Sequence, residues 1–193
     1  MNLVDRAKNI ILRPKEEWPI VDNETTDVPS LYKNYIVPLA AIPVIGGLIG
    51  ISLVGMPMPF GGTYHMPFGP SLGSALARYV LSLVGVYVVA LIVNALAPSF
   101  SGEKNLVQAL KVTAYAYTPA WLAGIFLLIP WLGVLGLLAS LYSLYLLYLG
   151  LPVLMKSRPD RALGYTAVVV ISAVFLVHPG GMPMQPFGPG AGQ

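Results

Sequence analysis

The chain has 193 residues, of which 56% are hydrophobic and only 10% are charged, whereas soluble domains carry roughly 25% charged residues. A formal net charge of +3 is too small to indicate a nucleic-acid partner, and the absence of cysteine excludes disulfides and thiolate metal sites. The composition therefore predicts a membrane protein built as one bundle.

The first 34 residues predict a cytoplasmic amphipathic helix followed by a polar linker. Charges near the start interrupt the place where a cleavable apolar signal would lie, and Pro14 ends the helical pattern. Such a helix can lie on lipid headgroups, with Trp18 as an interfacial anchor, or pack on the cytoplasmic end of the bundle. Its apolar face holds Leu3, Val4, Ala7, Ile10 and Ile11, opposite Arg6, Lys8, Asn9 and Arg13.

Residues 35–177 predict an all-α transmembrane domain of five helices. The strongest signal is the run from Thr113 to Pro152, which contains no Asp, Glu, Lys, Arg or His and is long enough for two spans of roughly 20 residues. Backbone groups in lipid must be paired within the protein, so these runs have to be helical. The expected spans are about 35–54, about 72–97, two within 113–152 that fold at Pro130, and about 162–177.

Proline and glycine shape the first of these spans. Pro38 and Pro43 predict kinks, while Gly46 and Gly50 form a GxxxG motif that favours close approach of a neighbouring helix. The uncharged stretch 55–70 that follows cannot be regular helix, and we expect an ordered or polyproline-like loop.

The distribution of charge predicts the orientation of the bundle. Ten of the eleven Lys and Arg residues, all but Arg78, lie on the N-terminal segment, on residues 98–111 or on residues 155–161. With five spans these segments share one side, which the positive-inside rule makes cytoplasmic. Residues 178–193 then form an extracytoplasmic tail rich in Gly, Pro and Met.

The side chains that common membrane enzymes need are missing from the sequence. It has no HExxH zinc motif and no phosphate-binding P-loop, and all eight carboxylates lie on the expected cytoplasmic segments. Gly69 to Gly73 matches G-x-S-x-G, but a nucleophile elbow needs a strand before its helix, and Ser71 is expected to cap the second span. We therefore expect no enzymatic activity and assign no catalytic residue.

Two stretches carry a family resemblance: MNLVDRAKNIILRPKEEWP at the start, and QALKVTAYAYTPAWLAGIFLLIPWLGVLGLLASLYSLYLLYLGLPVLMK from Gln108. Over about residues 1–177 the chain resembles the bacterial branch of the Yip-one (Ypt-interacting protein) domain family. The resemblance implies a five-helix protein of the bacterial inner membrane with a cytoplasmic N-terminus. Eukaryotic relatives are associated with Rab-type GTPases, but that role presupposes prenylated GTPases that bacteria lack, so it is not carried over. The residues aligned with the family motif are Tyr117, Thr118, Pro119, Gly150, Leu151 and Pro152.

A methionine-rich repeat lies outside that motif. GMPMPFG at Gly55 to Gly61 recurs as GMPMQPFG at Gly181 to Gly188, and the expected topology places both copies on the outer face. Thioether and imidazole ligands without thiolate suit a soft ion, Cu(I) or Ag(I). The alternatives are an adaptable surface that packs on a partner, or no specific role. The candidate ligands are Met56, Met58, His65 and Met66 in the loop and His178, Met182 and Met184 in the tail.

The sequence is interpreted as a non-enzymatic membrane protein that organises or scaffolds other membrane components, including as an accessory subunit of a larger complex. Expected partners are membrane lipids and either another membrane protein or a second copy of the chain. The alternative is a small-solute or metal channel or transporter. A continuous polar cavity through the bundle would favour the alternative, and a solid interior favours the first interpretation.

Overall fold

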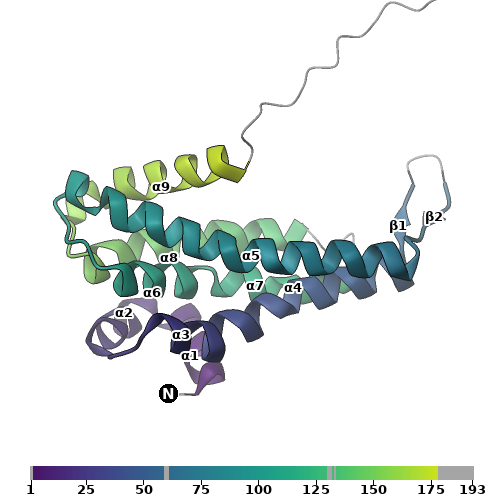
Figure 1. Ribbon diagram of the computed structural model, residues 1–193, viewed down its shortest axis with the longest axis horizontal. Helices are drawn as coiled ribbons and strands as arrows, with labels where there is room; N and C mark the ends of the chain where they lie inside the picture. The colour runs from purple at the N-terminus through teal and green to yellow at the C-terminus, as the bar shows by residue number, and fades with distance from the viewer. Residues whose placement is uncertain (1, 59–60, 130–131, 133, 178–193) are drawn as a thin grey trace, which may run out of the picture.

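The computed structural model describes residues 2–58, 61–129, 132 and 134–177, which form a helical bundle with a small strand pair at one end (Figure 1). The N-terminal elements are α1 (Leu3–Leu12), α2 (Pro14–Asn23), α3 (Val28–Leu31), the π-helical turn η1 (Tyr32–Ile36), α4 (Val37–Ile49), the π-helical turn η2 (Gly50–Val54), β1 (Met56–Pro57) and β2 (Thr63–Tyr64). The remaining elements are α5 (Phe68–Leu96), the 3₁₀ turn η3 (Ala97–Phe100), α6 (Leu106–Ala116), α7 (Thr118–Ala123), the 3₁₀ turn η4 (Gly124–Leu128), α8 (Val134–Leu154), the 3₁₀ turn η6 (Pro159–Arg161) and α9 (Ala162–Val177).

Local sequence explains how the first helices begin. The side chain of Asn2 accepts a hydrogen bond from the Val4 N–H at 3.4 Å, which caps α1. Pro14 opens α2, where its missing N–H costs nothing and its fixed φ suits the first turn. The α1–α2 pair, here called the N-terminal hairpin, therefore contains two helices where the sequence predicted one.

Three helical stretches are long and apolar enough to cross a membrane unaided: Val28–Val54, Phe68–Phe100 and Val134–Leu154. The chain is therefore an integral membrane protein. The second stretch starts at Phe68, not near residue 72, so Ser71 lies in the first turn of the helix and does not cap it. Its hydroxyl donates to the Met66 carbonyl at 3.3 Å instead.

The third and fifth expected spans are not among these three long helical stretches. The third is divided at Tyr117 into α6 and α7, because Pro119 has no N–H to donate to the preceding turn. Helix α7 then continues as the 3₁₀ turn η4. The fifth is α9, whose 16 residues have the predicted bounds. Pro130 falls outside the described residues, although η4 and α8 on either side of it lie side by side. Five transmembrane spans are therefore not established by helix length alone.

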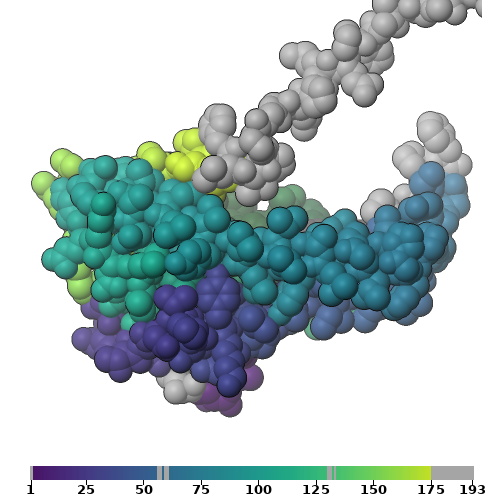
Figure 2. Space-filling view, in the orientation of Figure 1, coloured from purple at the N-terminus to yellow at the C-terminus, as the bar shows by residue number. Residues whose placement is uncertain are grey.

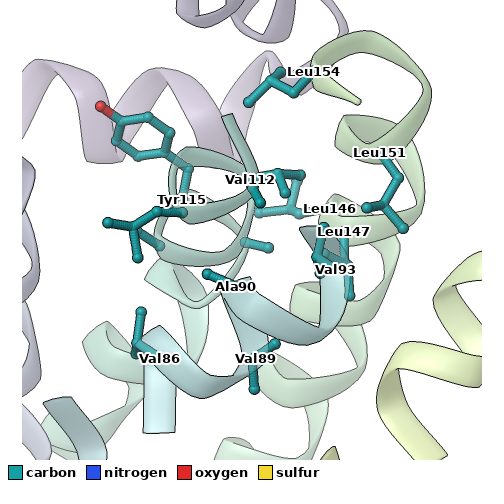
Figure 3. Close-up of a cluster of buried hydrophobic side chains, with 14 of the residues drawn as sticks. Val86, Val89, Ala90, Val93, Val112, Tyr115, Leu146, Leu147, Leu151 and Leu154 are labelled. Atoms are coloured by element: carbon teal, nitrogen blue, oxygen red, sulfur yellow. The ribbon is translucent and has the colours of Figure 1, made fainter. Parts of the chain in front are cut away.

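Helix α6 forms the centre of the bundle. Residues Ala109 to Ala116 are all buried, and α6 packs against α5 and α8. Val112 and Tyr115 of α6, Val93 of α5 and Leu147 of α8 belong to one buried apolar cluster, and Figure 3 shows Val93 beside Leu147, with Tyr115 on the other side of α6. The sequence assigned residues 98–111 to a connection on the cytoplasmic side, whereas Ala109, Leu110 and Lys111 belong to this buried helix.

The uncharged stretch between α4 and α5 contains the only strands among the described residues. Strands β1 and β2 pair antiparallel, with Met56 opposite Tyr64 and Pro57 opposite Thr63. Gly55 leads into β1 with φ +76°, where a Cβ would also lie 2.5 Å from a Thr63 methyl carbon. Glycine is therefore required at this corner.

The segments predicted to share the cytoplasmic side lie together at the opposite end of the bundle (Figure 1). The Glu103 N–H donates to the Met155 carbonyl at 2.8 Å, and Lys156 forms an ion pair with Asp22 of α2. The N-terminal hairpin, the α5–α6 connection and the α8–α9 connection thus form one polar end.

Candidate functional site

The N-terminal hairpin is packed into the polar end of the bundle. Ile10, Trp18 and Val21 have at most 1% of their surface exposed. The expectation that Trp18 is an interfacial anchor is wrong, because its ring lies between α6 and α8. Val4 and Leu12 of α1 remain exposed, at 63% and 66%, so only this other flank of the helix is available to lipid.

Arg6 lies at the centre of the contact between this hairpin and the bundle. Its guanidinium is paired with Glu17, Nη1 to Oε1 at 2.5 Å, and also with Glu24. It also lies over the ring of Tyr115, 5.5 Å from the centroid, in cation–π geometry. The sequence placed Arg6 on the polar face, but it is four residues before Ile10 and therefore points the same way into the core.

Lys111 holds the C-terminal end of α2. Its Nζ donates to the Val21 carbonyl at 2.8 Å and to the Glu24 carbonyl at 2.5 Å, which are groups that a helix end leaves unsatisfied. Burial lowers the pKa of Lys111, and the carboxylates of Glu24 and Asp22 act in the opposite direction. A cation at a helix C-terminus also interacts favourably with the helix dipole.

Two of the motif residues lie beside this polar network. The hydroxyls of Thr118 and Tyr35 are 2.7 Å apart in a buried hydrogen bond, and the Tyr35 ring packs edge-on against Tyr115 at 4.7 Å. Gly150 allows α8 to approach both α6 and the hairpin, since a Cβ there would lie 2.6 Å from Val112 Cγ2 of α6 and 2.8 Å from Trp18 Cζ2 of α2. The other motif residues surround this contact: Pro119 and Leu151 are buried, Pro152 is half-buried within α8, and Tyr117 is 36% exposed between α6 and α7.

Gly46 and Gly50 lie in a second close contact, between α4 and η4. A Cβ at Gly46 would lie 2.4 Å from the Gly124 carbonyl oxygen, and one at Gly50 would lie 2.0 Å from the Leu127 carbonyl oxygen. Backbones that approach this closely leave room only for glycine.

Of the candidate metal ligands, those of the loop lie within the described residues and those of the tail lie outside them. His65 and Met66 follow β2, and the Met66 N–H donates to the Ile51 carbonyl at 3.3 Å. Met58 lies nearer the turn between the strands, where its N–H donates to the Gly62 carbonyl at 3.1 Å, and it is 52% exposed, while only the backbone of Met56 is described. No cluster of three His, Asp or Glu residues suited to a metal occurs in the described part of the chain. His178, Met182 and Met184 lie outside it.

Comparison with known proteins settles the family. The sequence model of the Yip1 domain matches residues 8–178. The chain belongs to the Yip1 domain family. It is 26% identical over 168 residues to the inner membrane protein YohC of Escherichia coli strain K12, with 86% of each chain covered, and the YohC of Escherichia coli O6:H1 strain CFT073 matches equally well. No solved structure matches the chain.

In this Yip1-family protein the N-terminal hairpin and the bundle meet in a contact around Arg6, Tyr35 and Lys111, here called the polar junction. The residues aligned with the family motif lie on only one side of this contact. The sequence resemblance identifies Tyr117, Thr118, Pro119 and Gly150, but it does not identify the polar residues that they adjoin. The helical spacing of Arg6 and Ile10 was the available signal for one of these. The junction satisfies its charges internally, and its chemistry is that of a structural joint between helices. The residues missed by sequence reasoning are Arg6, Glu17, Glu24, Tyr35 and Lys111.

Proposed function

We propose that this Yip1-family protein is a non-enzymatic protein of the bacterial inner membrane that organises or scaffolds other membrane components, including as an accessory subunit of a larger complex. The observation that carries the proposal is the filled centre of the bundle. Helix α6 occupies that position, and the burial of every residue from Ala109 to Ala116 supports a solid interior over a solute path along this helix. A scaffold needs a well-packed interior and a surface that binds other proteins, whereas a channel needs a water-filled path through its interior.

The proposed arrangement in the membrane has five transmembrane helices, a cytoplasmic N-terminus and a C-terminus outside. It is supported by the gathering of the positively charged connections at one end of the bundle. Helix α9 packs beside α5 and α8, and its 16 residues span about 24 Å. Local thinning of the bilayer would accommodate that length at modest cost.

The outer surface offers a place for a partner. On α8 the apolar side chains Val134, Leu137, Leu138 and Leu141 are each at least 60% exposed. Their spacing of three and four residues places them in one stripe along the helix. Such a stripe suits lipid tails and also a transmembrane helix of another protein or of a second copy.

Site-specific photocrosslinking in native membranes tests the proposal. A photoreactive residue at Leu141, in the exposed stripe, should give a discrete protein adduct. The same residue at Leu146, which is fully buried, should give none. Flux measurements on the purified protein in liposomes complete the test, because a scaffold should leave solute and metal leakage at the level of empty liposomes. Protein-dependent flux without any adduct would reject scaffolding in favour of a channel or transporter.

A further inference from the structure

Arg78 is the only charged side chain of α5, and it is exposed. All eight side-chain carboxylates of the protein lie in the described residues, yet none of the ion pairs there includes Arg78. The carboxylates belong to the N-terminal segment and to the connections at the polar end. A guanidinium on a membrane helix needs an anionic or hydrogen-bonding partner, and such residues mark functional sites by default.

The position of Arg78 along α5 matches the depth of lipid headgroups. Ala97 starts the turn that leads to the polar end, and 19 residues separate it from Arg78, or about 28 Å of helix. The hydrocarbon core of a bilayer is about 30 Å thick. If Ala97 lies at one surface, Arg78 therefore lies near the phosphates of the opposite leaflet. This placement rests on the proposed membrane embedding, but it holds for either orientation.

Arg78 also borders a groove between α4 and α5. The groove has a volume of about 250 Å³ and is mainly apolar, with polar groups contributed by α5. Leu127 of η4 closes it. Ser71, Ser74, Arg78 and Ser82 recur at intervals of three and four residues, so they line one face of α5. The facing wall includes Pro43 and Gly47 of α4 and Ile51 of η2.

The serine hydroxyls in this groove already donate their protons to the helix. Ser74 Oγ donates to the Ser71 carbonyl at 2.9 Å, and Ser82 Oγ donates to the Tyr79 carbonyl at 2.7 Å. Their oxygens therefore remain as acceptors, while Arg78 supplies the N–H donors. The groove thus combines one cationic donor with neutral acceptors and an apolar wall, which complements a phosphodiester carrying hydroxyl groups and an acyl chain.

We propose that the groove between α4 and α5 binds one anionic phospholipid, with its phosphodiester on the Arg78 guanidinium. The planar guanidinium can hold two phosphate oxygens at once, which a lysine cannot. Ser74 lies one turn nearer the membrane surface than Arg78, and its acceptor oxygen favours a headgroup whose own hydroxyls can donate, as those of phosphatidylglycerol do. An anionic lipid also compensates the single positive charge, whereas a zwitterionic lipid does not.

Native mass spectrometry of the full-length protein in detergent tests this site. The protein is mixed with equal amounts of phosphatidylglycerol and phosphatidylethanolamine that carry the same acyl chains. The wild type should retain one phosphatidylglycerol in preference. Arg78→Gln should lower that retention by roughly tenfold, the order of one hydrogen bond to a charged group. Ser74→Leu keeps the charge and narrows the groove, so it should also lose the lipid.

The matched control is Arg13→Gln, which removes the same charge from a side chain that is 73% exposed at the polar end. It should retain phosphatidylglycerol as the wild type does. Equal retention of the two lipids by the wild type, unchanged binding by Arg78→Gln, or equal losses in both Arg variants would overturn the proposal. Lipid retention is measured on the isolated chain, so this outcome is independent of whether the protein captures a partner.

Discussion

The indole of Trp18 lies directly against Gly150, although the two residues belong to opposite ends of the sequence. A Cβ at Gly150 would lie 2.8 Å from Trp18 Cζ2 and 2.9 Å from Cε2. The absence of a side chain on α8 therefore sets the distance between the N-terminal hairpin and the bundle. Gly150, which the sequence resemblance aligned with the family motif, thus acts here through the absence of a side chain.

Gly150→Ala should destabilise the protein, because Trp18 and Val112 would both have to move. Overpacking of this kind costs about 1–3 kcal/mol. The measurement is thermal unfolding in detergent. Gly136→Ala on the same helix is the matched control, since no atom lies within 4 Å of a Cβ there, and it should leave the unfolding temperature unchanged or slightly raised. Equal shifts in the two variants would contradict the close contact.

Arg6→Met should loosen the N-terminal hairpin. Removing one partner of a buried ion pair leaves Glu17 uncompensated, at a cost of about 3–5 kcal/mol. Limited trypsin cleavage within the hairpin, after Lys8 or Lys15, should accelerate, and the unfolding temperature should fall. The comparison is Arg13→Met, which breaks a pair whose side chains are both 73% exposed and should cost at most about 1 kcal/mol. A harmless Arg6→Met would mean that the pair contributes no stability.

Gly50→Ala should disturb the contact between α4 and η4 more than Gly47→Ala. A Cβ at Gly50 would meet the Leu127 carbonyl oxygen at 2.0 Å, whereas one at Gly47 would make an ordinary contact of 3.9 Å with a Leu127 methyl carbon. The difference should be measurable as a lower unfolding temperature for Gly50→Ala alone. If Gly47→Ala is the more damaging change, the backbone contact does not set this spacing.

Reporter fusions test the five-span arrangement. A reporter after Arg161 should be cytoplasmic and one after Gln193 extracytoplasmic, since α9 would separate them. Alkaline phosphatase and a fluorescent protein give opposite signals on the two sides and so serve as reciprocal controls. Two fusions on the same side would show that α9 does not cross the membrane.

Titration with Cu(I) under a competing chelator tests the methionine-rich repeat as a soft-metal site. Wild-type protein should bind at a fixed stoichiometry, and a variant with Met56, Met58, Met66, Met182 and Met184 all replaced by Leu should lose that binding while keeping its apolar volume. Zn(II) is the control ion, because thioethers bind it poorly. Equal Cu(I) binding by the Leu variant would leave the repeat as an interaction surface.

Local patterns predicted the parts of the fold that depend on local physics. Hydropathy located the bounds of α9, and Pro14 located the end of α1, because chain polarity and a missing N–H act over a few residues. The family resemblance was likewise confirmed by the Yip1 match over residues 8–178. Helix α6 was misjudged, since its burial depends on the packing of α5 and α8 around it.

The polar junction could not be predicted from local sequence patterns either, because it depends on residues that are far apart in the chain. The helical spacing of Arg6 and Ile10 places both side chains on one face, but that spacing alone does not predict that a guanidinium is buried. Its burial depends on Glu17 and Glu24, which are 11 and 18 residues away, and on Tyr115, which belongs to α6. A charge can be buried only when such partners are assembled around it, and no short window contains them all.

The contacts of the N-terminal hairpin also set an order of events during synthesis. Asp22 pairs with Lys156, which is synthesised 134 residues later. The Ile11 carbonyl accepts a hydrogen bond from the Tyr142 hydroxyl, which is synthesised 131 residues later. Contacts so distant in sequence form late. The N-terminal hairpin is translated before α8 and is therefore among the last parts of the described chain to reach its final contacts. A ribosome that stalls before α8 would leave the hairpin without the surface on which it rests.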